Sequence, residues 1–431
     1  MYLFQLSPPN GLNNWQKIKS KGYLTWVSRP SPLTNYNSLD GVVGLEYAIL
    51  KNFCEIKVIK LVILNSKSNG ELFAKLDSYN VDIAGANLTV TERRLQKYPS
   101  SIAYDETYIN LISSARRPKI NSLDELKGLT GGVLKNSSYE EISDALTQTK
   151  AQINSFDNTN LYELLQMVTD DVIDYTFADS NIVAIYQAYI PKLRIGLKIS
   201  GMRELVFLYP SKSKQDDSLR IKLDKFIASY KQDNRVDKYK QFISDILPNS
   251  RPADTVTFLG NYNKRWPLIN KIVYTIADKY NMSPVLLGAI SYQESHWNAS
   301  AISPTLVKGL MMLTKAVAKE QGVMNRFDSL QSLEGGARHF LKMKKKIPQR
   351  IKEPDRTSFA LAAYNIGYGH LEKSRVIAQR AGSDPDSWHQ VKQFLPLLND
   401  LEGVKADGKT AVRYVENIRV YQNLLQWKEQ Q

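Results

Sequence analysis

Residues 281–295 read NMSPVLLGAISYQES, and this stretch predicts a helix with a carboxylate on its apolar face. The Ser-Pro pair at 283–284 is a typical helix start, because serine can cap the first turn and proline fits into it. Leu287, Ile290 and Glu294 follow at spacings of three and four residues, which places them on one side of the helix. The stretch therefore predicts a core helix that ends in an acidic group.

Glu294 is the first candidate catalytic residue. Burial disfavours the charged form of a carboxyl group, and so does the helix dipole near a carboxyl end, so both raise its pKa. A carboxyl group that stays protonated near neutral pH can protonate a glycosidic oxygen. The alternative is a glutamate at the helix edge, solvated or paired with a cation such as Lys308.

The chain around this helix divides into parts that differ in periodicity and residue composition. Residues 264–431 show helical spacing throughout and no convincing strand pair, which predicts an all-α domain. Residues 249–263 are rich in turn formers and lack periodicity, which predicts a linker. Residues 22–248 alternate short β-branched stretches with helical ones, which predicts an α/β domain with parallel sheets. Residues 1–21 would be an amino-terminal segment, left by a truncated or processed start.

Composition narrows the class of protein. The 431 residues are 43% hydrophobic and 23% charged, which are ordinary globular values, and no apolar run reaches the ~18 residues of a membrane span. The net charge of +14 favours a polyanionic partner, although a general basic surface bias explains it equally well. The short run Lys344–Lys346 is no nucleic-acid arm, so nucleic acid is not expected as a partner.

Cysteine and histidine give no sign of a metal or cofactor. The single cysteine, Cys54, lies in an apolar helical stretch and is expected in the core. The four histidines have no metal-ligand spacing with acidic or cysteine partners. We therefore expect neither a metal site nor a cofactor.

Four short segments indicate a function only when they are considered together. Each has an ordinary structural explanation alone, such as core methionines or a helix stop. In this order and at these separations they resemble the lytic murein transglycosylases of the Slt type, over roughly residues 266–425. The segments are Glu294-Ser295, Gly309-Leu310-Met311-Met312, Ala363-Tyr364-Asn365-Ile366-Gly367 and Glu416-Asn417-Ile418. The resemblance implies a goose-lysozyme-like helical fold.

The resemblance also implies roles for individual residues. Glu294 would be the catalytic acid and base, and Ser295 would orient it or the N-acetyl group of the sugar. Tyr364 and Asn365 would bind substrate, and Glu416 would support the cleft. The family's usual glutamine falls on Met312, but Met-Met-Leu-Thr is what the membrane-bound transglycosylase F subgroup carries there.

The expected reaction follows from the presence of one candidate acid, Glu294, without an obvious second carboxylate beside it. Ordinary glycosidases use two carboxylates, whereas the 6-hydroxyl of MurNAc can act as an internal nucleophile and give a 1,6-anhydro product without water. The expected function is non-hydrolytic cleavage of the MurNAc–GlcNAc bond of peptidoglycan. A water-using muramidase is one alternative. A periplasmic solute-binding sensor with a non-catalytic, wall-docking helical domain is another.

The amino-terminal domain has its own candidate site. Thr89, Thr91 and Arg94 follow a strand, which suits a ligand that bears a carboxylate, although a capped helix with solvated arginines explains them equally well. The run resembles the bacterial extracellular solute-binding proteins of the polar amino-acid type. That resemblance implies a two-lobed cleft, with Ser138 near a ligand-facing helix start and Asp179 as the acid for an α-amino group.

The resemblance leaves the role of the cleft open. A cell-wall peptide or muropeptide in it would regulate the enzyme, or the domain would be only a spacer or a wall-docking surface. The subgroup's name implies a periplasmic protein, peripheral to the outer membrane.

Overall fold

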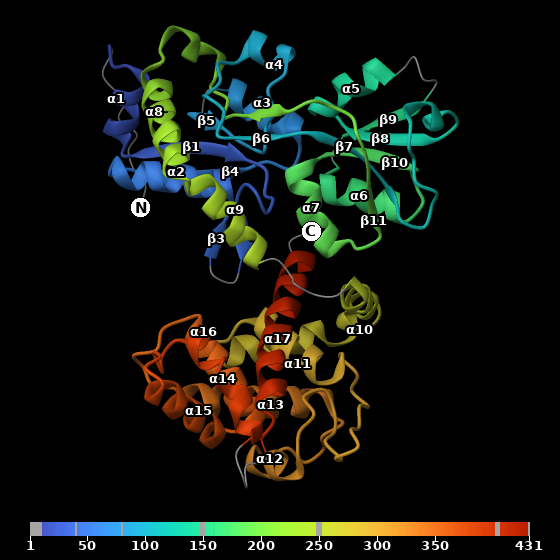
Figure 1. Ribbon diagram of the computed structural model, residues 1–431, viewed down its shortest axis with the longest axis vertical. Coiled ribbons are helices and arrows are strands. Elements are labelled where there is room, and N and C mark those ends of the chain that lie inside the picture. The colour runs from blue at the N-terminus through green and yellow to red at the C-terminus, as the bar shows by residue number, and fades with distance from the viewer. Residues whose placement is uncertain are drawn as a thin grey trace. The chain divides into compact units, whose positions relative to one another are not determined.

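The computed structural model describes residues 11–38, 41–78, 81–146, 151–157, 159–246, 252–400 and 406–429. The chain forms two compact units, Met1–Leu247 and Pro248–Gln431, whose elements Figure 1 labels. None of the described helices is long and apolar enough to cross a membrane. Of the expected segment 1–21, residues 1–10 lie outside the described part, and α1 (Asn14–Lys21) packs against the first strand of the first unit.

A three-stranded parallel sheet forms the first lobe of the first unit, in the order β4–β1–β5. Its central strand is apolar on both faces, since Leu24, Trp26 and Val27 are fully buried, as expected of a parallel sheet between helices. Cys54 is buried in the same core. The elements of this lobe are β1 (Tyr23–Ser28), β2 (Tyr36–Ser38), β3 (Gly41–Val43), α2 (Leu45–Ile56), β4 (Lys60–Asn65), α3 (Asn69–Asp77), β5 (Ile83–Ala84), α4 (Glu92–Lys97), α8 (Ser218–Gln232) and α9 (Arg235–Ile246).

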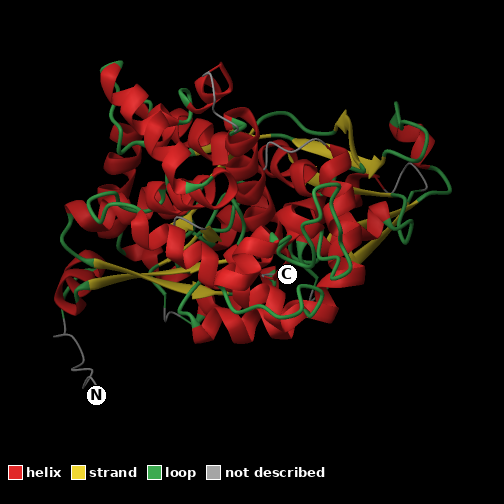
Figure 2. Ribbon diagram, turned by 90° about the horizontal axis from the view of Figure 1, so that it is seen from below, coloured by secondary structure: helices red, strands yellow, loops and turns green. Residues whose placement is uncertain are grey.

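A five-stranded sheet forms the second lobe, in the order β11–β7–β10–β8–β9, and Figure 2 shows the strands of the unit flanked by helices. The prediction of parallel sheets holds for the pairs β10–β8 and β8–β9 but is wrong for β7, which runs antiparallel to both β10 and β11. The chain reaches β7 directly from β6 without a helical crossover, so β7 need not run parallel to its neighbours. The elements of this lobe are β7 (Ile109–Ser114), β8 (Thr130–Leu134), α5 (Ser138–Leu146), β9 (Gln152–Phe156), α6 (Leu161–Thr169), β10 (Tyr175–Asp179), α7 (Ser180–Tyr189) and β11 (Leu193–Lys198). The short strands β6 (Asp105–Thr107) and β12 (Arg203–Leu205) pair with each other outside this sheet.

The second unit is helical, as predicted, and α17 packs against both α11 and α14 (Figure 1). Its described residues form no strand and only isolated β-bridges, such as Ile302 with Lys308, and Leu395–Asp400 form a short 3-10 helix. The helices are α10 (Pro252–Lys279), α11 (Pro284–Ser295), α12 (Lys315–Glu320), α13 (Ser329–Lys346), α14 (Asp355–Ile366), α15 (Tyr368–Arg380), α16 (Trp388–Val391) and α17 (Gly408–Glu429).

The linker expected over 249–263 is largely helical instead. The α10 helix begins at Pro252, and residues 249–251 lie outside the described part. Thr255 and Phe258 are fully buried, and the ring of Phe258 stacks on that of Tyr421 in α17 at 5.8 Å. The turn-forming residues concealed this helix in the sequence, because the rings that cover Phe258, those of Tyr292, Trp297 and Tyr421, come from other parts of the chain.

Candidate active site

The α11 helix positions Glu294 as the sequence predicts. The side chain of Ser283 caps the helix by accepting a hydrogen bond from the amide of Leu286 at 3.2 Å. Leu287 and Ile290, on the same side as Glu294, are fully buried. Glu294 itself is half-buried in the next-to-last position of the helix.

Burial gives Glu294 the protonation behaviour of an acid catalyst. It raises the pKa of the carboxyl group from its ordinary value to about 7, against the opposing effect of a hydrogen bond from the hydroxyl of Tyr414. That hydroxyl lies 2.5 Å from Oε1 of Glu294. No second carboxylate shifts this pKa in the part of the chain that the structure describes. The site therefore offers one proton at neutral pH and no obvious carboxylate nucleophile.

Two tyrosines accompany the acid. The rings of Tyr364 in α14 and Tyr414 in α17 are stacked, with centroids 6.4 Å apart. Burial raises the pKa of both phenols well above the ordinary value, and the nearby charge of Glu294 adds to the effect. Both hydroxyls therefore remain protonated donors. That of Tyr364 lies 3.5 Å from the carbonyl oxygen of Met311.

The turn at residues 309–312 has a backbone that few side chains allow. Gly309 has φ +81°, and a Cβ there would lie 1.7 Å from the carbonyl oxygen of Arg326. The hydroxyl of Ser295 donates to the carbonyl of Leu310 at 2.9 Å, which ties the turn to the end of α11. Met312 follows with φ 41°, a strained value for a bulky residue, and is half-buried. The hydroxyl of Ser295 is thus directed at the turn and not at the Glu294 carboxylate.

Two predicted residues lie farther from the acid. Asn365 is exposed beside Tyr364, near the end of α14. Glu416 is exposed on α17 and pairs with Lys392 at 3.1 Å. The structure therefore brings together Glu294 and Tyr364 and leaves Glu416 in a surface ion pair.

The sequence interpretation missed Tyr414. It lies two residues before Glu416, in the segment that carries the family resemblance, and is 5% exposed. The helical spacing of Ala411, Tyr414, Val415 and Ile418, all buried, indicates which face of α17 turns inward. That periodicity could have singled out the tyrosine, because a hydroxyl on a buried face needs a partner.

The predicted residues of the amino-terminal cleft are all buried. Arg94 donates to the carbonyl of Thr89 at 2.7 Å and lies over the ring of Phe73. Ser138 is the first residue of α5. The Oγ1 atom of Thr89 and the Oδ1 atom of Asp179 are buried and have no hydrogen-bond partner among the described residues.

Arg94 and Asp179 are close enough to affect each other's ionisation. Burial lowers the pKa of Arg94 to about 10, against the opposing charges of Glu141 and Asp179. Burial raises the pKa of Asp179 to about 6, although a hydrogen bond from the hydroxyl of Tyr139 at 2.9 Å and the charges of Arg203 and Arg94 oppose the shift. These groups form a polar centre between the two lobes.

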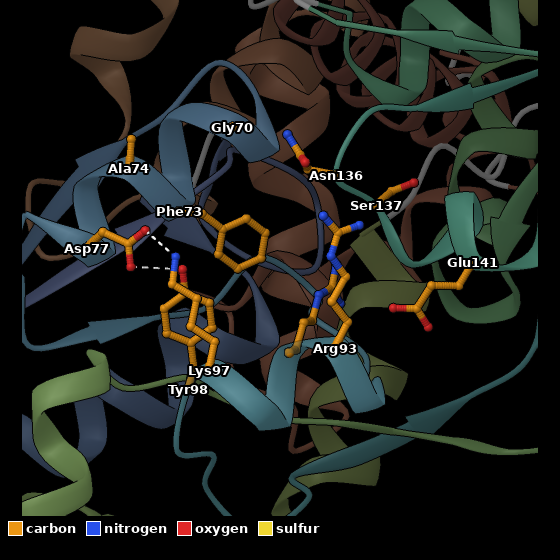
Figure 3. A pocket seen from close by; sticks show the side chains of 11 residues that line it. Gly70, Phe73, Ala74, Asp77, Arg93, Lys97, Tyr98, Asn136, Ser137 and Glu141 are labelled. Carbon is orange, nitrogen blue, oxygen red and sulfur yellow. Dashed lines mark hydrogen bonds and ion pairs between the residues drawn. The ribbon is translucent and has the colours of Figure 1, made fainter.

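A pocket of about 340 Å³ adjoins this centre (Figure 3). Its wall in the first lobe carries Phe73, Asp77, Lys97 and Tyr98, and dashed lines mark the bonds that Lys97 and Tyr98 donate to the carboxylate of Asp77. Ser137 and Glu141 come from the second lobe. Of the four predicted residues, Arg94 lines this pocket.

Among the described residues, no group of three or more histidine, cysteine or acidic side chains could hold a metal ion.

Fold and site together define a solute-binding-protein-like domain followed by a transglycosylase domain. Residues 24–243 match the bacterial extracellular solute-binding proteins, family 3, and residues 272–386 match the transglycosylase SLT domain. Solved structures are similar over the first unit. An ancestral arginine-binding protein bound to arginine is 22% identical, with a TM-score of 0.46, 51% of this chain and 97% of that chain covered. An amino-acid ABC transporter substrate-binding protein from Streptococcus pneumoniae bound to L-arginine is 22% identical, with a TM-score of 0.48, 53% of this chain and 97% of that chain covered.

Relatives match nearly the whole chain. A protein of Saccharophagus degradans named membrane-bound lytic murein transglycosylase F is 36% identical, over 96% of this chain and 84% of that protein. Proteins of the same name from Alcanivorax borkumensis and Cellvibrio japonicus are 33% and 32% identical, over 96% and 100% of this chain and 90% and 88% of those proteins. The chain belongs to the membrane-bound lytic murein transglycosylase F family.

Proposed function

We propose that this chain cleaves the β-1,4 bond between MurNAc and GlcNAc in peptidoglycan without water. The observation that carries the proposal is the solitary acid. Glu294 has a pKa of about 7, bonds only to a phenol, and has no second carboxylate near it among the described residues. A hydrolase of the common kind needs two carboxylates, one of them as nucleophile or base.

The reaction uses Glu294 twice. The protonated carboxyl gives its proton to the glycosidic oxygen as the bond from that oxygen to C1 of MurNAc breaks. The carboxylate then takes the proton of the MurNAc 6-hydroxyl while the oxygen of that hydroxyl bonds to C1. The acid is regenerated, no water is consumed, and the product ends in a 1,6-anhydro ring. The internal hydroxyl competes with water because it is held beside C1.

The groups around Glu294 stabilise its carboxylate, bind the sugar and hold the 309–312 turn in place. Tyr414 donates to the carboxylate and so stabilises the charged state between the two proton transfers. Tyr364 is a second protonated donor at the site, suited to a sugar oxygen. Ser295 acts as a positioning residue, because it fastens the 309–312 turn to α11. Roles for Met312, Asn365 and Glu416 in substrate binding belong to this proposal.

Analysis of the reaction products tests the proposed activity. Purified sacculi are digested with wild type and with Glu294→Gln, and the products are identified by mass spectrometry. We expect 1,6-anhydro-muropeptides from wild type and a loss of at least about a thousandfold in the variant. Reducing ends in place of anhydro ends would instead establish a water-using muramidase. Unchanged products from the variant would remove Glu294 from the mechanism.

The amino-terminal domain is proposed to bind a small ligand that regulates this activity. The unpaired Oδ1 of Asp179 and Oγ1 of Thr89, beside the buried guanidinium of Arg94, support a ligand that bears both an ammonium and a carboxylate. A cell-wall peptide has both groups. The test is anhydro-muropeptide release with and without added stem peptide, and equal rates would leave the domain as a spacer.

We also propose a periplasmic location, peripheral to the outer membrane, in keeping with the substrate and with the relatives' name. In our proposal residues 22–248 and 264–431 are the functional domains. Fractionation of cells, followed by a salt wash of the membranes, tests the location. A protein found only in the cytoplasmic fraction would contradict it.

A further inference from the structure

Arg29 is a half-buried cation that the proposed ligand site does not yet use. It directly follows β1, at the carboxyl end of the central strand of the first lobe. One of its terminal nitrogens donates to Oδ1 of Asn69 at 2.6 Å, and Asn69 in turn reaches the carbonyl of Lys135 in the second lobe. Arg29 forms no ion pair within 4.0 Å with any described residue. Its guanidinium has five N–H donors, so the bond to Asn69 leaves most of them unused.

Arg29 lies beside the ligand cleft, because the bonds from Arg29 to Asn69 and from Asn69 to the carbonyl of Lys135 adjoin Gly70 and Asn136, which both line the pocket. Its pKa is lowered by burial, and the charges that oppose the shift are those of Tyr186 and Tyr139, both from the second lobe. Tyr139 is the residue whose hydroxyl bonds to Asp179. It also affects the pKa of Arg94. Tyr139 therefore lies within electrostatic reach of both arginines, which links Arg29 to the cleft.

The cleft holds more positive than negative charge. Arg94 is buried, and Arg29 and Arg203 are half-buried, Arg203 with a bond to the carbonyl of Val90. None of the three forms an ion pair within 4.0 Å with a described residue. The charges of Asp179 and Glu141 act on Arg94, and that of Asp179 is coupled to Arg203 as well, whereas no acid is found to act on Arg29 among the described residues. Guanidinium groups keep their charge in proteins, so this excess is balanced by an anion and not by loss of a proton.

We propose that the cleft selects an acidic ligand, an amino acid or short peptide with one ammonium and two carboxylates, and that Arg29 binds the second carboxylate. Asp179 would take the ammonium and Arg94 the first carboxylate, as the proposed function already has it. Arg29 would then be the residue that decides specificity. A bidentate pair between guanidinium and carboxylate suits its unused donors. The inference rests on the proposed ligand-binding role of the domain.

Calorimetry on the full-length chain tests the inference with amino-acid probes. D-Glutamate supplies a second carboxylate, D-glutamine is its neutral isostere of the same size, and L-arginine carries the opposite charge. We expect D-glutamate to bind wild type at least tenfold more tightly than D-glutamine. Arg29→Gln should reduce that preference to less than twofold and leave the affinity for D-glutamine unchanged. Arg29→Lys, which keeps the charge, should retain part of the preference.

The controls separate specificity from folding and from bulk charge. Arg116→Gln removes an exposed arginine of the second lobe and should keep the full tenfold preference. Thermal unfolding shows whether Arg29→Gln is folded. D-Glutamine or L-arginine binding as tightly as D-glutamate would overturn the acidic specificity. A tenfold preference that survives in Arg29→Gln would overturn the role of Arg29 as the residue that binds the second carboxylate. Binding of no probe would overturn both this inference and the ligand-binding role, whereas the release of anhydro-muropeptides is measured independently.

Discussion

The hydroxyl of Tyr414 donates a 2.5 Å hydrogen bond to Oε1 of Glu294, although the two residues are 120 positions apart. The bond joins α11 to α17 at the only acid of the candidate active site within the described residues. It favours the carboxylate, whereas burial favours the protonated form. These opposing effects give Glu294 a pKa of about 7. A single substitution at Tyr414 removes the effect of the hydrogen bond.

Replacing Tyr414 with phenylalanine should shift the pH profile of murein cleavage. The protonated acid starts the reaction, so activity of wild type should fall as pH rises through about 7. Without the phenol the carboxylate is less stable and the pKa of Glu294 rises, so the alkaline limb should move to higher pH. Below the limb we expect a loss of about tenfold, since a hydrogen bond to a charged group contributes about 1.5–3 kcal/mol.

The measurement for Tyr414→Phe is the pH dependence of anhydro-muropeptide release. Tyr274→Phe is the matched control, because it removes a phenol that bonds to a carboxylate, Glu429, away from the site. Its profile should coincide with that of wild type. An alkaline limb that does not move in Tyr414→Phe would mean that the bond does not set the pKa of Glu294.

Glu294→Gln should stabilise the folded protein at alkaline pH. The pKa of the carboxyl group is about 7 when folded against an ordinary value of 4.5, so the folded state binds the proton more tightly than the unfolded chain. The stability that Glu294 provides is fully present below pH 4.5 and is lost as pH rises through 7. At pH 8 the ionised group should cost up to about 3 kcal/mol, and the neutral amide escapes this cost.

Thermal unfolding of wild type and Glu294→Gln at pH 5 and pH 8 measures this effect. The difference in midpoint should be larger at pH 8, in favour of the variant. The other acids with raised pKa values, which include Glu46, Asp179 and Asp224, are common to both proteins, so their effects cancel in the comparison. Equal differences at the two pH values would indicate a carboxyl group with an ordinary pKa.

Gly309→Ala should destabilise the second unit and abolish activity. An alanine there combines φ +81° with a Cβ 1.7 Å from the carbonyl oxygen of Arg326, so the backbone of the turn has to move. We expect a loss of at least about 3 kcal/mol. Gly322→Ala is the control, since Gly322 has φ +67° but a Cβ there would meet nothing within 4 Å, and it should cost about 1 kcal/mol. Denaturant unfolding with similar losses for both variants would contradict the steric argument.

The residues that the sequence revealed are those whose signal is local. Glu294 follows from the spacing on one helix, and Leu287 and Ile290 are buried as that spacing requires. The bond from Tyr414 could not be inferred, because helical periodicity gives the buried face of α17 but not the helix opposite it. The same limit hid Arg29, since nothing in the sequence near β1 shows that a guanidinium lacks an acidic partner. The family resemblance identified Thr89, Arg94, Ser138 and Asp179, whereas the charge excess around them needed the fold.

Asn181→Ala should weaken ligand binding in the amino-terminal cleft. Asn181, at the start of α7 in the second lobe, and Asn87 in the first exchange side-chain hydrogen bonds of 2.9 and 3.4 Å. These bonds favour the arrangement in which the lobes are close, so without them a ligand must supply more of the free energy of closure.

We expect the affinity for D-glutamate to fall about fivefold, as the loss of about 1 kcal/mol implies. Amide exchange in segments 85–91 and 179–182 should also rise in the free protein. Asn121→Ala, on an exposed loop of the second lobe, should change neither quantity. Faster exchange with an unchanged affinity would mean that the two asparagines hold the free lobes together but contribute nothing to the bound state.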